Sequence, residues 1–352
     1  MTIKKFKKLI IIVTVAFCNY NFIAFSQATV TFETVTKALK YTGNKDVVKK
    51  LIITGKISGN DYSEGSEWRE FRFLDKTFPN IEEVEILTDQ NIPDYDETNK
   101  CALFYWREYN SKYVYEYNSS QWLKTFSAPN IKYVGSESFA YCANLTSVNF
   151  PQATSIGSET FNGCLNLTTI NFPLVTNIGN WAFAFCSNLT SLDFPLVTNI
   201  GSWTFAFCYD LTTINFPLVT NIEHGAFESC FNLTSVDFPL VTNIGNDAFS
   251  WCENLTTVDF PLVANIGWSA FSFCEDLASV SFGTGFRTET KIRFDKDVFF
   301  DVKTKHVDLI LGKNVLPKPA TLKIWQSNNT KPRTNYFWKS IKIKANTTSN
   351  KK

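Results

Sequence analysis

Seven cysteines are the first candidates for chemistry, because they recur at a single spacing of 22 residues. They are Cys142, Cys164, Cys186, Cys208, Cys230, Cys252 and Cys274. No CxxC pair and no cluster of histidines accompanies them, so a metal site is not predicted. If each cysteine occupies the same place in a repeat, the thiols point the same way and do not face one another as a disulfide requires. The spacing therefore favours buried free thiols, with bridges between some of them as the alternative.

Carboxylates also recur at this spacing, in one column with amide side chains. The column is Asn149, Asn171, Asp193, Asn215, Asp237, Asp259 and Ser281. Asp237 and Asp259 are expected to lie one repeat apart, and a close pair of carboxylates is what glycoside hydrolysis uses. The column, however, extends through the whole repeat region. We therefore interpret it as a solvated ladder or as part of a binding face, and not as a catalytic or calcium site.

Other signatures of enzymes are absent from the sequence. His224 is one of two histidines, and the equivalent positions of its sister repeats hold Ser202 and Asn246. It is interpreted as a solvated loop residue and not as a general base. No Ser/His/Asp set recurs, and no GxGxxG or phosphate-binding loop is present. We therefore predict a protein that is not an enzyme and has no catalytic residues, no cofactor and no resident metal ion.

The residues around each cysteine repeat as well, and they predict a repeat solenoid with a parallel strand face. A fixed period of 20–50 residues is typical of stacked coils. In one coil, Leu189, Leu192 and Phe194 alternate with polar residues, which predicts a short parallel strand with these three side chains inside. Pro195 lacks an N–H group and ends the strand. A single helical or 3₁₀ turn on the opposite side is expected to bury Phe205 and the following cysteine.

The repeat pattern divides the chain into five parts. They are a signal peptide (1–26), an N-terminal cap with irregular coils (27–118), the repeat array (119–286), a C-terminal cap (287–345) and a disordered tail (346–352). Within the N-terminal cap, residues 48–53 and 81–86 have the pattern of strands, residues 31–41 of a short helix, and residues 89–118 of an inserted loop. A cap is expected because the end coil of a solenoid otherwise exposes its core to water.

The first 26 residues have the features of a secretion signal. Lysines at residues 4–8 precede a mostly apolar stretch at residues 9–17, and Ala24 and Ser26 are small residues suited to cleavage after Ser26. Lipid attachment at Cys18 is the alternative, although the residue before it is bulky. The apolar stretch is shorter than the ~20 residues that a membrane-spanning helix needs, and no other long one follows. We therefore predict a secreted or cell-surface protein without a membrane span.

Net charge argues against nucleic acid as a partner. The chain has 34 Lys and Arg residues against 33 Asp and Glu. A balance of this kind provides no strong overall field that would attract a polyanion.

Two surfaces are candidates for binding. One is the outward face of the strands, with rows of hydroxyl, amide and carboxylate groups at Thr190, Asp193, Thr212, Asn215, Thr234, Asp237, Thr256 and Asp259. These rows suit an extended partner or a glycan, or they are simply a solvated face. The other surface is aromatic, with columns at Trp181 and Trp203, at Phe185, Phe207, Trp251 and Phe273, and at Tyr209 and Phe231. Such rings either cover the edge of the core or form an interaction site.

The repeated motif Cys-x-x-Leu-x-x-Ile/Val-x-Phe-Pro-x-x-x-x-Ile-Gly-x-x-Ala-Phe resembles the BspA-like class of leucine-rich repeats. The resemblance is close over residues 123–286 and loose over 45–122 and 287–343. One slot departs from the common leucine-rich repeat, which has Asn or Cys where this chain has Val175, Val197, Val219, Val241 and Val263. The resemblance implies a secreted or surface protein that binds a protein partner, such as a host matrix or cell-surface protein, as an adhesin. Glycan binding through Trp181, Trp203 and the polar rows is the alternative.

Overall fold

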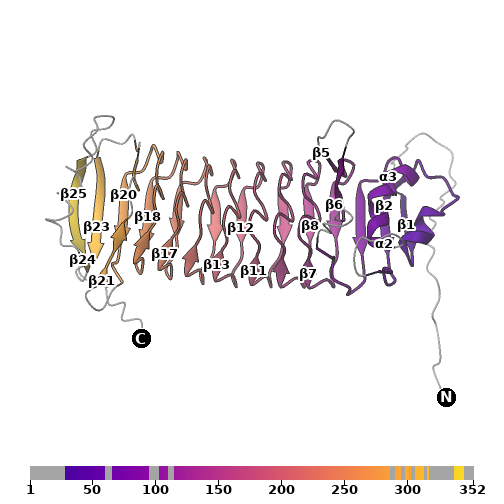
Figure 1. Ribbon diagram of the computed structural model, residues 1–352, viewed down its shortest axis with the longest axis horizontal. Helices are drawn as coiled ribbons and strands as arrows, with labels where there is room; N and C mark the ends of the chain where they lie inside the picture. The colour runs from indigo at the N-terminus through magenta and orange to yellow at the C-terminus, as the bar shows by residue number, and fades with distance from the viewer. Residues whose placement is uncertain are drawn as a thin grey trace, which may run out of the picture.

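Short parallel strands, contributed by each 22-residue coil, stack along one axis to build this protein. The computed structural model describes residues 28–59, 66–94, 103–109, 115–285, 290–294, 298–300, 302, 306–312, 315–316 and 337–344. Figure 1 shows an elongated stack of coils with the N-terminal coils at one end and the C-terminal strands at the other. The predicted solenoid is therefore confirmed. The predicted signal peptide, the predicted tail and Cys18 lie outside the described residues.

One side of the solenoid is a row of parallel strands with the order β1-β2-β3-β6-β8-β10, followed by β12-β14 and β16-β18-β20-β23-β25. Their bounds are β1 Ala28–Phe32, β2 Val48–Ile53, β3 Glu83–Ile86, β6 Thr125–Ser127, β8 Ser147–Asn149, β10 Thr169–Asn171, β12 Ser191–Asp193, β14 Thr213–Asn215, β16 Ser235–Asp237, β18 Thr257–Phe260, β20 Ser279–Phe282, β23 His306–Gly312 and β25 Phe337–Lys344. Neighbours in the array keep a register of 22 residues, as Leu192 opposite Ile214 shows. Equivalent side chains therefore lie beside one another.

A second row of two-residue strands follows the bend after each proline. It has the orders β7-β9-β11 and β13-β15-β17-β19-β22. The bounds are β7 Tyr133–Val134, β9 Ser155–Ile156, β11 Asn177–Ile178, β13 Asn199–Ile200, β15 Asn221–Ile222, β17 Asn243–Ile244, β19 Asn265–Ile266 and β22 Arg293–Phe294. In the five Asn–Ile strands, β11 to β19 of this row, the isoleucine is buried in the core and the asparagine points outward. The sequence did not predict this second row, and its strands form one wall of the groove that is described below.

The third side of each coil is a series of tight turns. Trp203 and Phe207 have φ angles of 52° and 62°, and a residue in the left-handed region interrupts a helix. The predicted short helical or 3₁₀ turn is therefore realised as single i→i+3 turns. Alternate N–H groups point along the solenoid axis instead: Trp203 donates to the carbonyl of His224 at 2.8 Å and Phe207 to that of Glu228 at 2.7 Å. These bonds connect successive coils on the turn side.

The core consists of the predicted inward positions, which stack between coils. Leu189, Leu192, Phe194, Val197, Ile200, Phe205 and Cys208 are all buried in one coil. Phe205 stacks on Phe183 with ring centroids 5.6 Å apart, and Phe194 stacks on Phe216 at 5.7 Å. Burial of such a side chain contributes ~1.5–3 kcal/mol. Because each ring is covered by rings of adjacent coils, a single coil does not retain this stabilisation by itself.

The seven cysteines of the array are free and fully buried. The thiol of Cys186 donates a hydrogen bond to the carbonyl of Phe161 at 3.3 Å, and that of Cys208 does the same to Phe183 at 3.3 Å. Burial raises the pKa of the Cys208 thiol to about 12, so the thiol stays protonated at neutral pH. The prediction of buried thiols is confirmed, and the alternative of bridges between these seven residues is wrong.

The N-terminal coils join the same sheet as the array. β2 and β3 coincide with the two predicted strands, and α1 (Val35–Leu39) lies within the predicted helix. Three short helical segments, α2 (Glu67–Glu70), η1 (Phe71–Phe73) and α3 (Leu74–Thr77), follow β2. The region expected to be an inserted loop instead contains the antiparallel hairpin of β4 (Tyr105–Tyr109) and β5 (Tyr115–Ser119). Near the other end, β21 (Thr290–Lys291) pairs with β24 (Val315–Leu316).

Candidate functional site

The outward face of the strands carries all eight polar residues predicted there, and all eight are exposed. The hydroxyl of Thr212 donates to the carbonyl of Thr190 at 3.0 Å, and Thr256 makes the same bond to Thr234. These threonines therefore strengthen the stacking of the coils. Their hydroxyl protons are already used within the protein.

The amide column of this face behaves in the same way. Asn215 Nδ2 donates to Asp193 Oδ1 at 2.7 Å. Asp237 and Asp259 lie opposite each other on β16 and β18, as predicted, and neither belongs to an ion pair among the described residues. The structure thus brings the two carboxylates together without a cation between them. Most of the face is a ladder whose groups contact each other.

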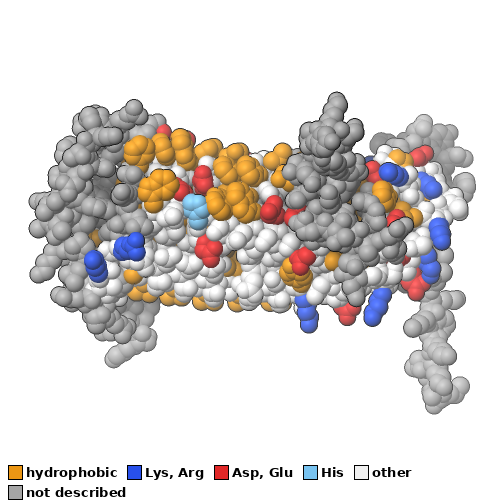
Figure 2. Space-filling model, viewed as in Figure 1, with side chains coloured by type: hydrophobic (Ala, Val, Ile, Leu, Met, Phe, Trp, Pro, Cys, Tyr) orange, Lys and Arg blue, Asp and Glu red, His pale blue; other side chains and the backbone are white. Residues whose placement is uncertain are grey.

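Trp181 and Trp203, the two predicted tryptophans, stack with ring centroids 4.7 Å apart. Similar stacks join Phe185 with Phe207 at 4.4 Å, Tyr209 with Phe231 at 5.0 Å and Trp251 with Phe273 at 4.0 Å. We call these eight residues the aromatic band. Every one is half-buried or exposed. Figure 2 shows hydrophobic side chains gathered along one edge of the face of the molecule that is in view. The structure therefore assembles the predicted aromatic columns into one surface on the turn side.

Two further apolar features were missed by the sequence analysis. Trp268 is 47% exposed, although it occupies a slot that other coils fill with polar residues. Leucines that follow the prolines form an exposed column of Leu174, Leu196, Leu218 and Leu240. The recurring Phe-Pro-Leu-Val motif was the signal for this column, since the leucine alternates with inward-pointing neighbours.

The coil that begins at Cys208 departs from the repeat next to the aromatic band. Glu223 replaces the glycine found at Gly201 and Gly245, and Gly225 stands where the preceding coil has Trp203. Gly225 has a φ of +58°, and a Cβ there would meet the indole of Trp203 at 2.5 Å. The missing side chain therefore makes room for the Trp203 ring. The segment Ile-Glu-His-Gly, in place of Ile-Gly, was a visible sign of this irregular coil.

His224 is the centre of a polar cluster in this coil. Its Nδ1 lies 2.8 Å from the carbonyl oxygen of Asn246 and 3.8 Å from Asp247 Oδ2. A carbonyl only accepts hydrogen bonds, so Nδ1 carries the proton and Nε2 of the neutral ring is left as an acceptor. The ring meets the indole of Trp203 edge to face at 4.3 Å. His224 is thus ordered by three neighbours, which is more structure than the predicted solvated loop residue would have.

Two carboxylates complete the cluster. Burial raises the pKa of Glu228, and the nearby Asp247 raises it further, while a hydrogen bond from the Trp203 indole opposes this shift. Burial also raises the pKa of Asp247, with His224 acting in the opposite direction. Trp203 and His224 therefore lie beside two carboxylates that are partly desolvated, and neither carboxylate is paired with a Lys or Arg among the described ion pairs.

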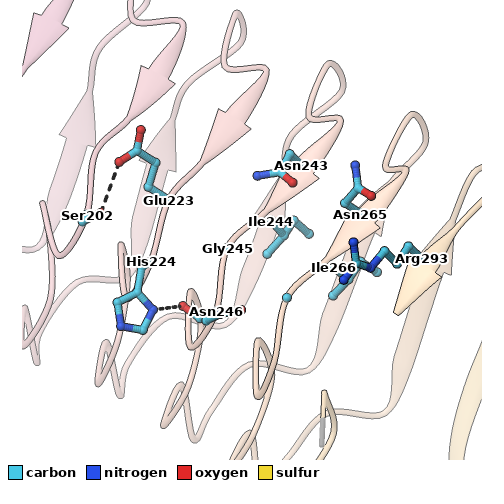
Figure 3. A pocket seen from close by; sticks show the side chains of 11 residues that line it. Ser202, Glu223, His224, Asn243, Ile244, Gly245, Asn246, Asn265, Ile266 and Arg293 are labelled. Carbon is cyan, nitrogen blue, oxygen red and sulfur yellow. Dashed lines mark hydrogen bonds between the residues drawn. The ribbon is translucent and has the colours of Figure 1, made fainter. Parts of the chain in front are cut away.

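A groove of about 440 Å³ lies beside this cluster and extends toward Arg293. Gly245 and Gly267 contribute backbone alone to its lining, which leaves the space open. Figure 3 shows the amides of Asn243 and Asn265 on neighbouring strands above the groove, with His224 at its lower rim. Asn243 donates to Asn221 at 2.7 Å, whereas no hydrogen bond joins the Asn265 amide to any of the described residues.

Glu223 closes one end of the groove. Its Oε1 accepts a hydrogen bond from Asn199 Nδ2 and its Oε2 from Ser202 Oγ, both at 3.1 Å, and Figure 3 shows the carboxylate turned toward Ser202. Across the described part of the chain, no group of three or more potential ligands is suited to a metal ion. In the same residues, no helix is long and apolar enough to cross a bilayer.

The comparison with known families decides the classification. A sequence model of the BspA type leucine rich repeat region matches residues 111–230 and 220–303 in six copies, which is more than half of the chain. The chain belongs to the BspA-type leucine-rich repeat family. The predicted resemblance is therefore confirmed, and the valines in the slot of the common Asn or Cys, such as Val175 and Val197, are buried in the core.

Solved structures similar to this BspA-type protein include other bacterial repeat proteins. A leucine rich cell surface protein from Faecalibacterium prausnitzii is 20% identical, with 75% of this chain and 83% of that chain covered and a TM-score of 0.39. A leucine-rich repeat protein from Bacteroides ovatus is 16% identical, with 85% and 84% covered and a TM-score of 0.40. The leucine rich repeat protein of T. pallidum is 22% identical, with 55% and 84% covered and a TM-score of 0.36. No curated protein matches the chain.

The family assignment is consistent with a protein-binding role, because BspA-type leucine-rich repeats are a scaffold that presents an extended surface. Curved or elongated repeat stacks offer such surfaces without a catalytic pocket. In this chain the extended surface carries the aromatic band and the His224 cluster.

Proposed function

We propose that this protein is a secreted or cell-surface binding protein that holds a protein partner against the aromatic band, as an adhesin does. The observation that carries the proposal is the band itself: four pairs of stacked rings, all half-buried or exposed, on one side of a rigid solenoid. Aromatic side chains are enriched at the centres of protein interfaces. A soluble protein rarely exposes so contiguous an apolar surface without a partner.

The geometry of the rings favours a protein over a glycan at the band. One face of Trp203 is covered by Trp181 at 4.7 Å, and His224 meets the ring at 4.3 Å. A sugar ring stacks on an open aromatic face, whereas a protein side chain also packs against ring edges. Because the rings cover one another's faces, edges make up much of the surface that remains.

The test is binding of the purified protein to matrix proteins and polysaccharides by surface plasmon resonance. Trp251→Ser removes a ring that is 39% exposed. Leu196→Ser is the matched control, since Leu196 is 39% exposed on another side. We expect saturable binding to at least one protein that is weakened by Trp251→Ser and by Tyr209→Ser but not by Leu196→Ser. Retention of that binding in both aromatic variants would refute the band as the interface.

The strand face provides the competing location for the same function. Asp193→Ala and Asn215→Ala are the variants that probe it, because both residues are exposed and contact each other at 2.7 Å. Loss of protein binding in these variants, with the aromatic variants unaffected, would move the interface to the strand face. We expect the opposite, since Asn215, Thr212 and Thr256 of that face already donate hydrogen bonds to their neighbours.

Glycan binding is the second candidate, and the groove favours it. Asn265 presents an amide that bonds to none of the described residues, in the groove that is also lined by His224 and by the backbone of Gly245 and Gly267. Amide and imidazole groups are suited to sugar hydroxyls. Saturable binding to a polysaccharide that Asn265→Ala abolishes would support this function. Absence of binding to every polysaccharide on the panel would exclude it.

A further inference from the structure

Charge is strongly segregated along the chain, although the total is close to neutral. Residues 133–286 contain no Lys or Arg but twelve acidic residues. Residues 287–352 carry sixteen Lys and Arg against five Asp and Glu. The twelve acidic residues are Glu137, Glu159, Asp193, Asp210, Glu223, Glu228, Asp237, Asp247, Glu253, Asp259, Glu275 and Asp276. From residue 133 onward the repeat array is therefore a polyanion that contains no Lys or Arg.

The acidic residues concentrate on the coils that carry most of the aromatic band. Ten of the twelve lie at Asp193 or beyond. Three of these ten, Asp193, Asp237 and Asp259, belong to the strand face, and seven lie elsewhere on the same coils. Figure 2 shows acidic side chains next to the hydrophobic ones on the face of the molecule that is in view. An apolar surface interleaved with carboxylates selects its partner by charge, because opposite potentials attract and like potentials repel at an interface.

One position on this surface, which we call the anchor site, has the groups that would bind a basic side chain. The indole of Trp203 lies over Gly225 and donates to Glu228, and Asp247 Oδ2 lies 3.8 Å from His224 Nδ1. A guanidinium or ammonium group placed here meets two carboxylates, with the edge of the indole beside it. Ion pairs are stronger at partly desolvated positions than in open solvent.

We propose that the coils from Cys186 to Cys274 dock a cationic, Arg- or Lys-bearing segment of another protein, with Trp203, Glu228 and Asp247 holding one basic side chain. This inference rests on the proposed protein-binding function and specifies the chemistry of its partner. Charge complementarity is the reason for the choice of occupant. The aromatic band then supplies the apolar contacts around the anchored cation.

A second copy of the chain is the other cationic occupant to consider, because residues 287–352 are basic. Contact between the array of one copy and the C-terminal part of the next would be a heterologous contact. Such contacts propagate into open chains unless they close into a ring. A basic segment of a different protein can pair with the same carboxylates and give a complex of limited size. We therefore assign the surface to another protein.

The test uses the purified protein and a fluorescein-labelled peptide of alternating Arg and Gly, followed by anisotropy. A peptide with Glu in place of Arg is the ligand control. We expect the double variant Glu228→Gln with Asp247→Asn to weaken Arg-peptide binding by about tenfold or more, as loss of close charge pairs does. The double variant Glu137→Gln with Glu159→Gln removes the same charge from the other end of the array, and it is expected to bind nearly as the unaltered protein does.

Equal affinity of the two double variants would overturn the anchor site, because binding would then reflect net charge alone. Equal binding of the Glu peptide would overturn the cationic assignment. Sedimentation in low salt gives a third outcome: self-association that the Glu228 and Asp247 changes abolish would assign the surface to a second copy. Binding of a matrix protein through Trp251, with an affinity that changes neither with salt nor in the carboxylate variants, would refute the cationic partner. That result would leave the proposed protein-binding function standing. If neither protein nor peptide binds, both fail.

Discussion

The indole rings of Trp181 and Trp203 stack with centroids 4.7 Å apart and planes 20° from parallel. They occupy the same position in adjacent coils, so the stack is a direct consequence of the 22-residue period. In a solenoid of this kind every side chain meets its own equivalent in the next coil. A column of amides forms hydrogen bonds, a column of aromatic residues stacks, and a column of carboxylates repels. The predictions below follow from this rule and from the places where the chain departs from it.

The carboxylate pair on the strand face is expected to limit stability. Asn215 donates to Asp193 at 2.7 Å, whereas Asp237 and Asp259 occupy the same column as two like charges. In Asp259→Asn, the new amide would donate to Asp237 in the way Asn215 does to Asp193. We expect the free energy of unfolding to rise by about 0.5–1.5 kcal/mol, the net contribution of one hydrogen bond. Urea denaturation monitored by circular dichroism measures it.

The converse change tests the same rule. Asn215→Asp removes the bond to Asp193 and aligns four carboxylates in one column. We expect a loss of about 1 kcal/mol, and added salt is expected to reduce this loss because the repulsion between exposed charges is screened. A loss that is the same in low and high salt would show that repulsion is not its cause.

The glycine column is expected to tolerate alanine unequally. A Cβ on Gly245 would meet the backbone of the preceding coil, with the carbonyl carbon of Glu223 at 2.6 Å and the amide nitrogen of His224 at 2.7 Å. On Gly201 the one contact under 3 Å, at 2.5 Å, is the side-chain oxygen of Asn180, so only a side chain and its hydrogen bond from the Ser202 amide nitrogen at 3.0 Å are displaced. Gly245→Ala should therefore lower the urea midpoint clearly. Gly201→Ala, the matched control, should change it little, and equal effects would contradict this reading of the column.

The thiols of the array are expected to be unreactive in the folded protein. Cys186 and Cys208 are buried, each thiol donates to a phenylalanine carbonyl at 3.3 Å, and burial raises the pKa of Cys208 to about 12. Because the thiolate is the nucleophile, Ellman's reagent should label these residues only after unfolding. The rate of labelling in increasing urea should follow the unfolding transition. Rapid reaction of the array cysteines in the native protein would refute their burial.

Glu228 is expected to make the protein less stable as the pH rises. Burial, followed by the charge of Asp247, raises its pKa above the ordinary 4.5. The folded state therefore binds the proton more tightly than the unfolded state, so the free energy of unfolding falls as the pH rises from 4.5 through the raised value. Glu228→Gln keeps an acceptor oxygen for the Trp203 indole and removes the titration.

The measurement for Glu228 is the urea midpoint as a function of pH. The Gln variant should be more stable than the unaltered protein at about pH 7, and this advantage should vanish at about pH 3, where both states bind the proton. Glu159→Gln controls for the loss of one negative charge from the array. A Gln variant that is less stable than the unaltered protein at neutral pH would contradict the desolvated environment of Glu228.

The sequence by itself determined the architecture of the array and the direction of its side chains. A period of 22 with apolar residues at fixed places can bury them only by stacking, so the inward positions of Leu189, Phe205 and Cys208 follow from the pattern alone. The same reasoning placed Asp193 and Trp181 on the surface, and excluded bridges as the favoured state of the cysteines. Outside the array the pattern is weak, and the hairpin of β4 and β5 was therefore missed.

Only the tertiary structure decided which outward groups are already used by their neighbours. The amide of Asn215 is bonded to Asp193, while that of Asn265 bonds to no described residue. Both are asparagines in regular columns, and their places in the repeat do not reveal this difference. The cluster around His224 also arises from placement, since Gly225 admits the Trp203 indole by lacking a side chain. Periodicity specifies which residues become neighbours, but distances and solvation specify what those neighbours do.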